Sequence, residues 1–449
     1  MGYSDQHPRI LPTYTASLDS DFDGSDTHDS APEYSRSASP NERVLAGNVM
    51  RTFSSLSTQD LPPSFEYSTD HLTLNLGDRK WHCPIPAYGY AGTIEGMIKI
   101  HQIENVSKVE VVLLGEVLTT VSEEAVPSQG ASKCFFKQKS MIWSSSSAGS
   151  TRQETHTFVI AFPKESADSG QNLPPSFYMA TDRYSARIQY RLRVDLFRKG
   201  LRRHKSLEIG VAYLPKSYAP VPQVRPMYIE TKSGGKQWWS RHLLPPVQPP
   251  GRSNTTKAVV PWEIVAELFL PSQIELTATS IVPYTMRIQL VSPAASQASH
   301  TPASLALVDA SVQLVKSIIT SVHGLNKRTD TIIAQGTILS DYQGTNTEEG
   351  EPSSSSGALE GVRVINGNLE VNRRSGSELS WKCQGFVQVK YCLMALVKPP
   401  SNVRALEGVF PTFRTAIDVD MKTHTKAEEH VNSDEVNADP SVGLFNLGP

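Results

Sequence analysis

Apolar and polar residues alternate with a period of two along most of the chain after residue 60. The clearest case is the stretch 187–197. One face would carry Ile188, Tyr190, Leu192, Val194 and Leu196, and the other Arg187, Gln189, Arg191, Arg193 and Asp195. Strict alternation of this kind is typical of an antiparallel strand with one buried and one solvated face. We therefore predict a half-buried strand here.

Other stretches show the same alternation or are rich in Val, Phe and Thr, which favour strands. They are residues 94–101, 106–121, 133–143, 154–163, 206–215, 260–271, 282–291, 380–399 and 411–421. No long stretch shows the 3.6-residue period of an amphipathic helix. Many short strands separated by turns predict an all-β protein built from β-sandwiches.

Composition divides the chain into five parts. Residues 1–60 hold eleven Ser, nine Asp or Glu and four Lys or Arg, with few large apolar side chains, which predicts a disordered acidic arm. Proline is dense within 223–256, where we predict an interdomain linker because Pro stops helices and central strands. The remaining parts are a β domain at 61–222, a second at 257–422 with a low-complexity loop at 344–361, and a disordered polar tail at 423–449.

Charge and cysteine content exclude several classes of function. The net charge of −2 excludes nucleic-acid binding through overall basicity. Four scattered cysteines suit neither a disulfide scaffold nor a zinc ribbon, and we expect Cys392 to be a buried thiol. The chain has no secretory-signal pattern, no 18-residue apolar span and none of the common catalytic motifs. We therefore expect a cytosolic protein without catalytic residues, metal or cofactor.

The order of these elements resembles the arrestin superfamily, especially fungal α-arrestin-like proteins. The signature is Leu173-Pro174-Pro175-Ser176-Phe177 before the alternating strand at 187–197, followed by the strand-like run at 206–215. The second half is similar to the arrestin C-terminal domain through residues 267–271, 281–291 and 387–397. A second copy of the first motif, Leu61 to Phe65, predicts shared turn chemistry at the start of a strand.

This resemblance implies two packed immunoglobulin-like β-sandwiches and a non-catalytic adaptor. Such a protein binds the cytoplasmic tails of membrane transporters or receptors at the plasma membrane or endosomes. Fungal α-arrestins typically recruit WW-domain, HECT-type ubiquitin ligases through PY motifs, so the cargo is ubiquitinated and internalised. This chain departs from the pattern because it contains no complete PPxY motif. The alternatives are a ligase-independent sorting scaffold, similar to a retromer subunit, and a purely structural protein.

The arm holds two short segments that resemble PY motifs. Leu11-Pro12-Thr13-Tyr14 is an LPxY form, and Ala31-Pro32-Glu33-Tyr34 is a poorer copy. Proline presets the extended backbone that an aromatic WW groove binds, and the tyrosine fills a second pocket. We predict ligase docking at Leu11, Pro12 and Tyr14, and less specifically at Pro32 and Tyr34. A Pro-x-Tyr triplet also arises by chance.

A basic hairpin is the second candidate site. Residues 183–205 hold nine Lys or Arg and a single acid, Asp195. We expect contact with anionic phospholipid or with an acidic or phosphorylated cargo tail. The candidate residues are Arg187, Arg191, Arg193, Arg198, Lys199, Arg202, Arg203 and Lys205, with Gly200 permitting the bend. The alternative is a solvated charge cluster that protects a sheet edge.

Two aromatic features remain. Trp238 and Trp239 stand at the start of the predicted linker, where we expect them to wedge between domains rather than bind a partner. Pro283-Tyr284 falls inside a strand pattern and is expected in the core rather than in a PY motif.

Overall fold

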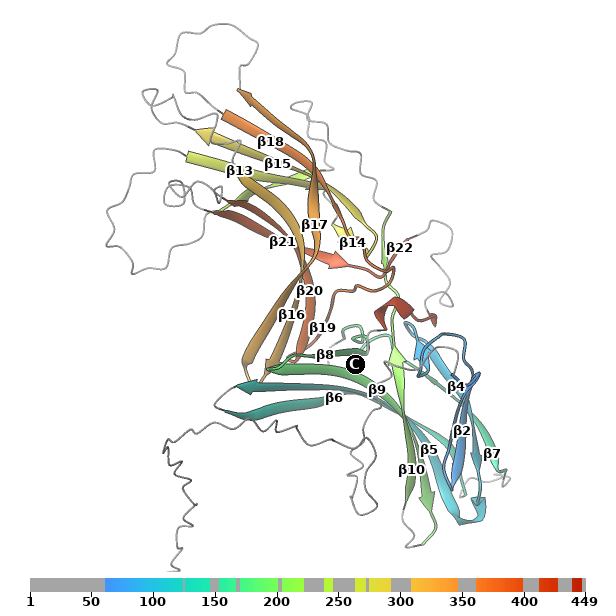
Figure 1. Ribbon diagram of the computed structural model, residues 1–449. Coiled ribbons are helices and arrows are strands. Elements are labelled where there is room, and N and C mark those ends of the chain that lie inside the picture. Colours follow the sequence, from blue (N-terminus) through green and yellow to red (C-terminus); the bar gives the residue numbers. More distant parts are fainter. Residues whose placement is uncertain are drawn as a thin grey trace, which may run out of the picture. The chain divides into compact units, whose positions relative to one another are not determined.

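A computed structural model places most of the chain after residue 60. It describes residues 61–123, 126–145, 153–166, 170–200, 204–221, 238–244, 263–271, 274–291, 308–345, 361–398, 412–426 and 438–445. All of them belong to one compact unit, Phe53–Pro449. The architecture is almost entirely β, as the alternation predicted, with curled sheets (Figure 1).

Two sheets are built from the first half. A four-stranded sheet has the order β1 (Ser64–Ser68), β2 (Leu72–Asp78), β4 (Thr93–Ile100) and β7 (Thr155–Ala161). A second sheet has the order β3 (Ala87–Tyr88), β10 (Lys205–Tyr213), β9 (Tyr184–Arg198), β5 (Val106–Glu123) and β6 (Val126–Ser144), with β8 (Phe177–Ala180) beside β9. A short 3₁₀ turn, η3 (Ile103–Asn105), links β4 to β5. The first Leu-Pro-Pro-Ser-Phe motif ends with the first two residues of β1, and the second ends with Phe177, the first residue of β8. Both copies therefore mark the start of a strand, as predicted.

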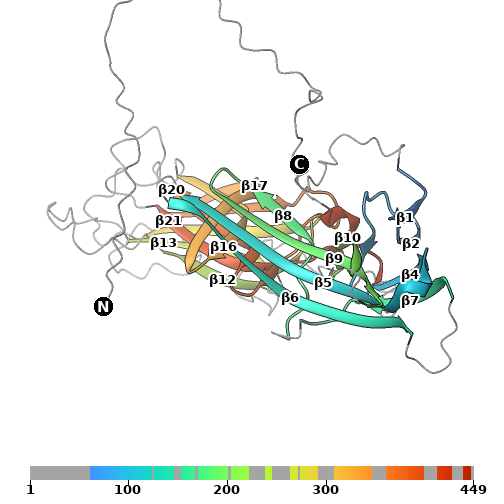
Figure 2. The same ribbon diagram turned by 90° about the horizontal axis from the view of Figure 1, so that it is seen from below.

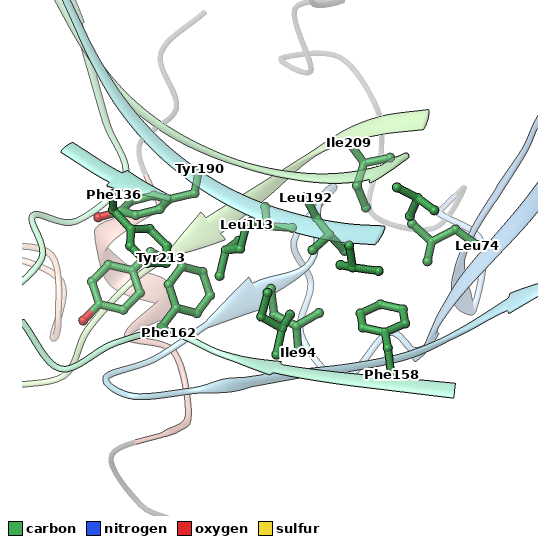
Figure 3. Close-up of a cluster of buried hydrophobic side chains, with 14 of the residues drawn as sticks. Leu74, Ile94, Leu113, Phe136, Phe158, Phe162, Tyr190, Leu192, Ile209 and Tyr213 are labelled. Atoms are coloured by element: carbon green, nitrogen blue, oxygen red, sulfur yellow. The ribbon is translucent and has the colours of Figure 1, made fainter. Parts of the chain in front are cut away.

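These two sheets share one apolar core. Ile94 and Phe158 of the four-stranded sheet face Leu113 and Leu192 of the other (Figure 3). The predicted inward face of β9 is confirmed, because Ile188, Tyr190, Leu192, Val194 and Leu196 are all buried. Burying one such side chain fully contributes about 1.5–3 kcal/mol, so a one-residue slip in register would be strongly unfavourable.

The second half forms one long curled sheet. Its order is β12 (Trp238–Leu243), β13 (Glu263–Pro271), β15 (Ile281–Val291), β18 (Gly361–Glu370), β17 (Leu325–Thr345), β16 (Asp309–Val322), β20 (Val387–Lys398), β21 (Phe413–Met421) and β14 (Glu275–Leu276), with β19 (Trp381–Cys383) beside β20. β17 pairs with β16 through its first half and with β18 through its second. The curl brings Leu244 to Arg414, and the two exchange backbone hydrogen bonds of 3.0 and 3.1 Å. Tyr284 is buried in this core, as predicted for Pro283-Tyr284.

The two halves are in direct contact. Phe177, Ile318 and Trp381 pack against both cores, and the Phe177 and Trp381 rings meet edge to face at 5.0 Å. Thr119 Oγ1 donates to the Ser321 carbonyl at 3.3 Å, linking β5 to β16. Apolar packing and hydrogen bonding therefore both join the halves.

Two segments predicted to lie outside the β domains contain strands. The predicted linker contains β12, a strand without proline that pairs with β13 at one end of the sheet order. The predicted disordered tail is instead anchored in its described part. There β22 (His424–Thr425) pairs in parallel with β11 (Tyr218–Ala219), and η6 (Val442–Leu444) follows buried Ser441. Backbone hydrogen bonds to distant residues hold this segment, which composition alone does not reveal.

Candidate functional site

The outer face of the β10–β9–β5–β6 sheet carries three of the eight predicted basic residues, Arg187, Arg191 and Arg193. Two rows of side chains cross it at successive outward positions. Arg191 lies opposite Leu114, which lies opposite Lys137, and Arg193, Val112 and Lys139 form the next row. The long strands β5, β6 and β9 run next to one another (Figure 2). The sheet therefore presents cations from both β9 and β6 on one surface.

Arg187, Arg191 and Arg193 occupy outward positions of β9, as predicted, but carboxylates compensate the charges of Arg191 and Arg193. The Arg191 guanidinium is paired with both Glu116 of β5 and Glu208 of β10. Burial lowers the Arg191 pKa, but the hydrogen bonds and charges of Glu208 and Glu116 outweigh it and raise the pKa overall. Arg187 is half-buried. Burial, and then the positive charge of nearby Arg191, lower the pKa of Arg187. Carboxylates from the neighbouring strands thus already bind the central arginine.

Asp195 organises the end of the ladder. Its side chain is only 4% exposed, and it accepts a 3.1 Å hydrogen bond from Arg193 Nε. His204 Nε2 lies 3.3 Å from its other carboxylate oxygen, and the His204 ring stacks on Phe197 at 4.9 Å. Lys108 Nζ also lies over the Phe197 ring, 5.2 Å from its centroid. The single acid of the hairpin therefore fixes the base of its turn.

The turn itself is described only in part. Gly200 adopts a positive φ of 70°, as the predicted bend requires. Lys199 and Lys205 are exposed and Arg198 is half-buried. Arg202 and Arg203 lie outside the described residues.

Sequence reasoning missed the cations of β6. Lys133, Lys137 and Lys139 are all exposed, while Phe135 and Phe136 between them are buried. Met141, 61% exposed, follows on the same face opposite Glu110. The lysine spacing was visible in the sequence, but the position of Lys137 and Lys139 beside the β9 arginines depends on strand register. Lys133 lies instead opposite Val117, in the row of buried Ile188.

This arrangement suits an extended anionic surface. Exposed ammonium groups on a sheet keep their hydration and act as point charges. Near an anionic bilayer each contributes about 1 kcal/mol, reduced by salt. The alternative prediction, a charge cluster that protects a sheet edge, also fits this face, because lysines on an edge strand such as β6 discourage pairing with another sheet.

The other predicted residues are separate from this face. Leu11, Pro12, Tyr14, Pro32 and Tyr34 lie outside the described residues. The backbone of Trp238 and Trp239 forms part of β12, opposite Pro271 and Leu270.

The cysteines are free thiols without a shared site. Cys83, Cys383 and Cys392 are buried and Cys134 is exposed, so the prediction of a buried Cys392 is confirmed. Burial raises the pKa of Cys383 to about 11 and also raises that of Cys392, which disfavours the reactive thiolate. Within the described ranges, no three His, Cys, Asp or Glu side chains cluster closely enough to hold a metal ion.

No protein-family model matches the chain, and a search of curated proteins finds no match. Among the described residues, no helix has the length and apolar character needed to cross a bilayer.

Proposed function

We propose that this protein is an arrestin-like trafficking adaptor built from two immunoglobulin-like β-sandwiches. It binds the cytoplasmic tails of membrane transporters or receptors and links them to ubiquitin-dependent endocytosis or sorting. In this proposal the protein is cytoplasmic and is recruited peripherally to the plasma membrane or endosomes. The observation that carries the proposal is the cationic outer face of the β10–β9–β5–β6 sheet.

The paired arginines and exposed lysines have different roles in this proposal. Arg191 and Arg193 are held by carboxylates and shape the face. Lys137 and Lys139 are exposed and make the first contact with an acidic or phosphorylated cargo tail or with anionic phospholipid. The Leu11–Tyr14 segment recruits a WW-domain, HECT-type ligase.

A ligase-independent sorting scaffold is the second candidate. It is favoured by the sequence, which contains no complete PPxY motif. Such a scaffold, similar to a retromer subunit, uses the same cationic face without a ligase.

One experiment with two readouts tests these roles. The full chain is assayed for binding to WW domains of HECT ligases and for co-sedimentation with phosphatidylserine vesicles. We expect Tyr14→Ala to abolish WW binding and leave vesicle binding unchanged. The Lys137→Glu/Lys139→Glu variant should lose at least about 2 kcal/mol of vesicle affinity, or at least about thirtyfold, and retain WW binding.

The control is Lys99→Glu/Lys164→Glu, which changes the net charge equally at two exposed positions away from this face. Equal vesicle binding by the two double variants would contradict the role of the cationic face. WW binding that survives Tyr14→Ala would remove the ligase-docking site and favour the scaffold.

A further inference from the structure

A second candidate binding site lies beside β2, β4 and β7 of the four-stranded sheet. It is a hollow of about 730 Å³. Its lining includes Gly96 and Phe158 as well as outward-facing positions of β4 and β7, where Glu95 is opposite Val159 and Met97 is opposite Thr157. The outward-facing side chains alternate with Ile94, Ile98, Phe158 and Ile160, which enter the core.

The walls of the hollow are held in place. One wall is the loop after β2, where Arg79 donates to the carbonyls of Pro62 and Cys83 and lies 4.0 Å over the Phe65 ring. The other wall is residues 438–440, fixed by a 2.8 Å hydrogen bond from the Gly89 N–H to the Ala438 carbonyl. A preformed site loses less conformational freedom when it binds a ligand.

The lining combines acidic and apolar groups. Carboxylates come from Asp78, Glu95 and Asp439, against one lysine, Lys80. Asp439 Oδ2 lies 3.8 Å from Lys216 Nζ. Asp78 and Glu95 form no ion pair with a described residue. Val159 is 63% exposed and Met97 is 43% exposed, and half-buried Trp81 adds an aromatic surface. Such a lining complements a cation that is flanked by aliphatic groups.

The β7 edge of the four-stranded sheet favours an extended peptide as the ligand. β7 ends the strand order, and among the described strands it pairs with β4 alone. An extended peptide that pairs with such an edge gains main-chain hydrogen bonds, and alternate side chains then point over the adjoining face. That face carries Thr157 and Val159 of β7, with Glu95 of β4 opposite Val159.

We propose that this hollow and the β7 edge bind an extended peptide segment of a partner protein in which Arg or Lys alternates with aliphatic residues. The peptide backbone pairs with β7, and a basic side chain reaches over β7 toward Glu95 of the adjacent strand β4. This site is formed mainly around β2, β4 and β7, with β3 of the other sheet also in its lining, and does not depend on the proposed adaptor function.

The test uses fluorescence anisotropy with the full chain and labelled peptides of about eight residues. The first peptide alternates Arg and Val, the second replaces Arg with Glu, and the third carries N-methyl groups on alternate amides of the first. We expect the first peptide to bind more tightly than about 1 mM and the other two to bind at least about tenfold more weakly.

Variants of the chain locate the binding. Glu95→Lys should weaken binding of the first peptide about tenfold, and Asp182→Lys, an equal change at an exposed position outside the hollow, should leave it unchanged. Thermal melting confirms that both variants fold. Absence of binding, equal affinity of the two variants, or equal binding of the N-methylated peptide would each overturn the proposal.

Discussion

Glu378 is a buried carboxylate with two charged or polar partners in the second half of the chain. Its Oε2 atom lies 2.7 Å from Lys316 Nζ and accepts a 2.6 Å hydrogen bond from the Tyr391 hydroxyl. The side chain of Lys316 is 24% exposed and that of Glu378 10%. Removing one member of a buried ion pair leaves the other charge uncompensated, which costs more than the pair contributes to stability.

Glu378→Gln should therefore lower the free energy of unfolding by about 3 kcal/mol in urea denaturation. The matched control is Asp330→Asn, because Asp330 pairs with Arg328 at 2.7 Å but both side chains are about half exposed. Such exposed pairs contribute at most about 1 kcal/mol. A loss for Glu378→Gln no greater than that of the control would contradict this account of the buried pair.

At the scale of the strands, the Tyr284 side chain of β15 packs against two glycines, Gly367 of β18 and Gly336 of β17. A Cβ atom added to Gly367 would lie 2.4 Å from the Tyr284 hydroxyl and 2.4 Å from the Thr337 carbonyl oxygen. Gly336 has the same ring at 2.7 Å. The two glycines therefore make the space that a large aromatic side chain fills in the core.

Gly367→Ala should destabilise the protein by about 1–3 kcal/mol, because the added methyl overpacks a site bounded partly by backbone. Gly210→Ala is the control, since its nearest neighbour is an Ile85 methyl at 4.0 Å and the same substitution fits there. Thermal melting of both variants checks this. Equal melting temperatures would mean that the strands separate without cost.

The strand faces were predictable because burial of one side of a sheet imposes alternation on the residues themselves. Leu192 and Arg191 could be assigned to opposite faces from sequence alone. The cationic face could be predicted only in part, because the proximity of Lys137 to Arg191 requires the register of three strands. The carboxylates that neutralise Arg191 come from two other strands and were missed for the same reason.

Across the whole described unit, the residues after 422 join both halves. The Ser441 N–H donates to the Leu214 carbonyl at 2.8 Å, and its hydroxyl donates to the Gly376 carbonyl at 3.1 Å. Thr423 and Ser217 exchange hydrogen bonds of 2.7 to 3.1 Å. Polar composition suggested a tail here, because contacts over such sequence separations leave no local pattern.

His424 makes this junction sensitive to pH. Its Nδ1 lies 2.9 Å from Thr423 Oγ1, and its ring is 5.9 Å from that of Tyr218. Burial, and then the charge of Lys216, lower the pKa of His424 below its usual value. The folded state therefore disfavours the protonated ring, whereas the unfolded chain protonates near pH 6.5. The stability that the neutral ring contributes is present above that pH and is lost as pH falls toward the folded-state pKa.

We expect His424→Asn to reduce the loss of unfolding free energy between about pH 7.5 and pH 5.5, by no more than about 1.4 kcal/mol per pH unit for one proton. His82→Asn is the control, because it makes the same substitution at an exposed histidine. Urea denaturation at each pH measures the difference. If the wild-type protein and His424→Asn had parallel pH profiles, the titrating group that controls the junction would have to be another residue.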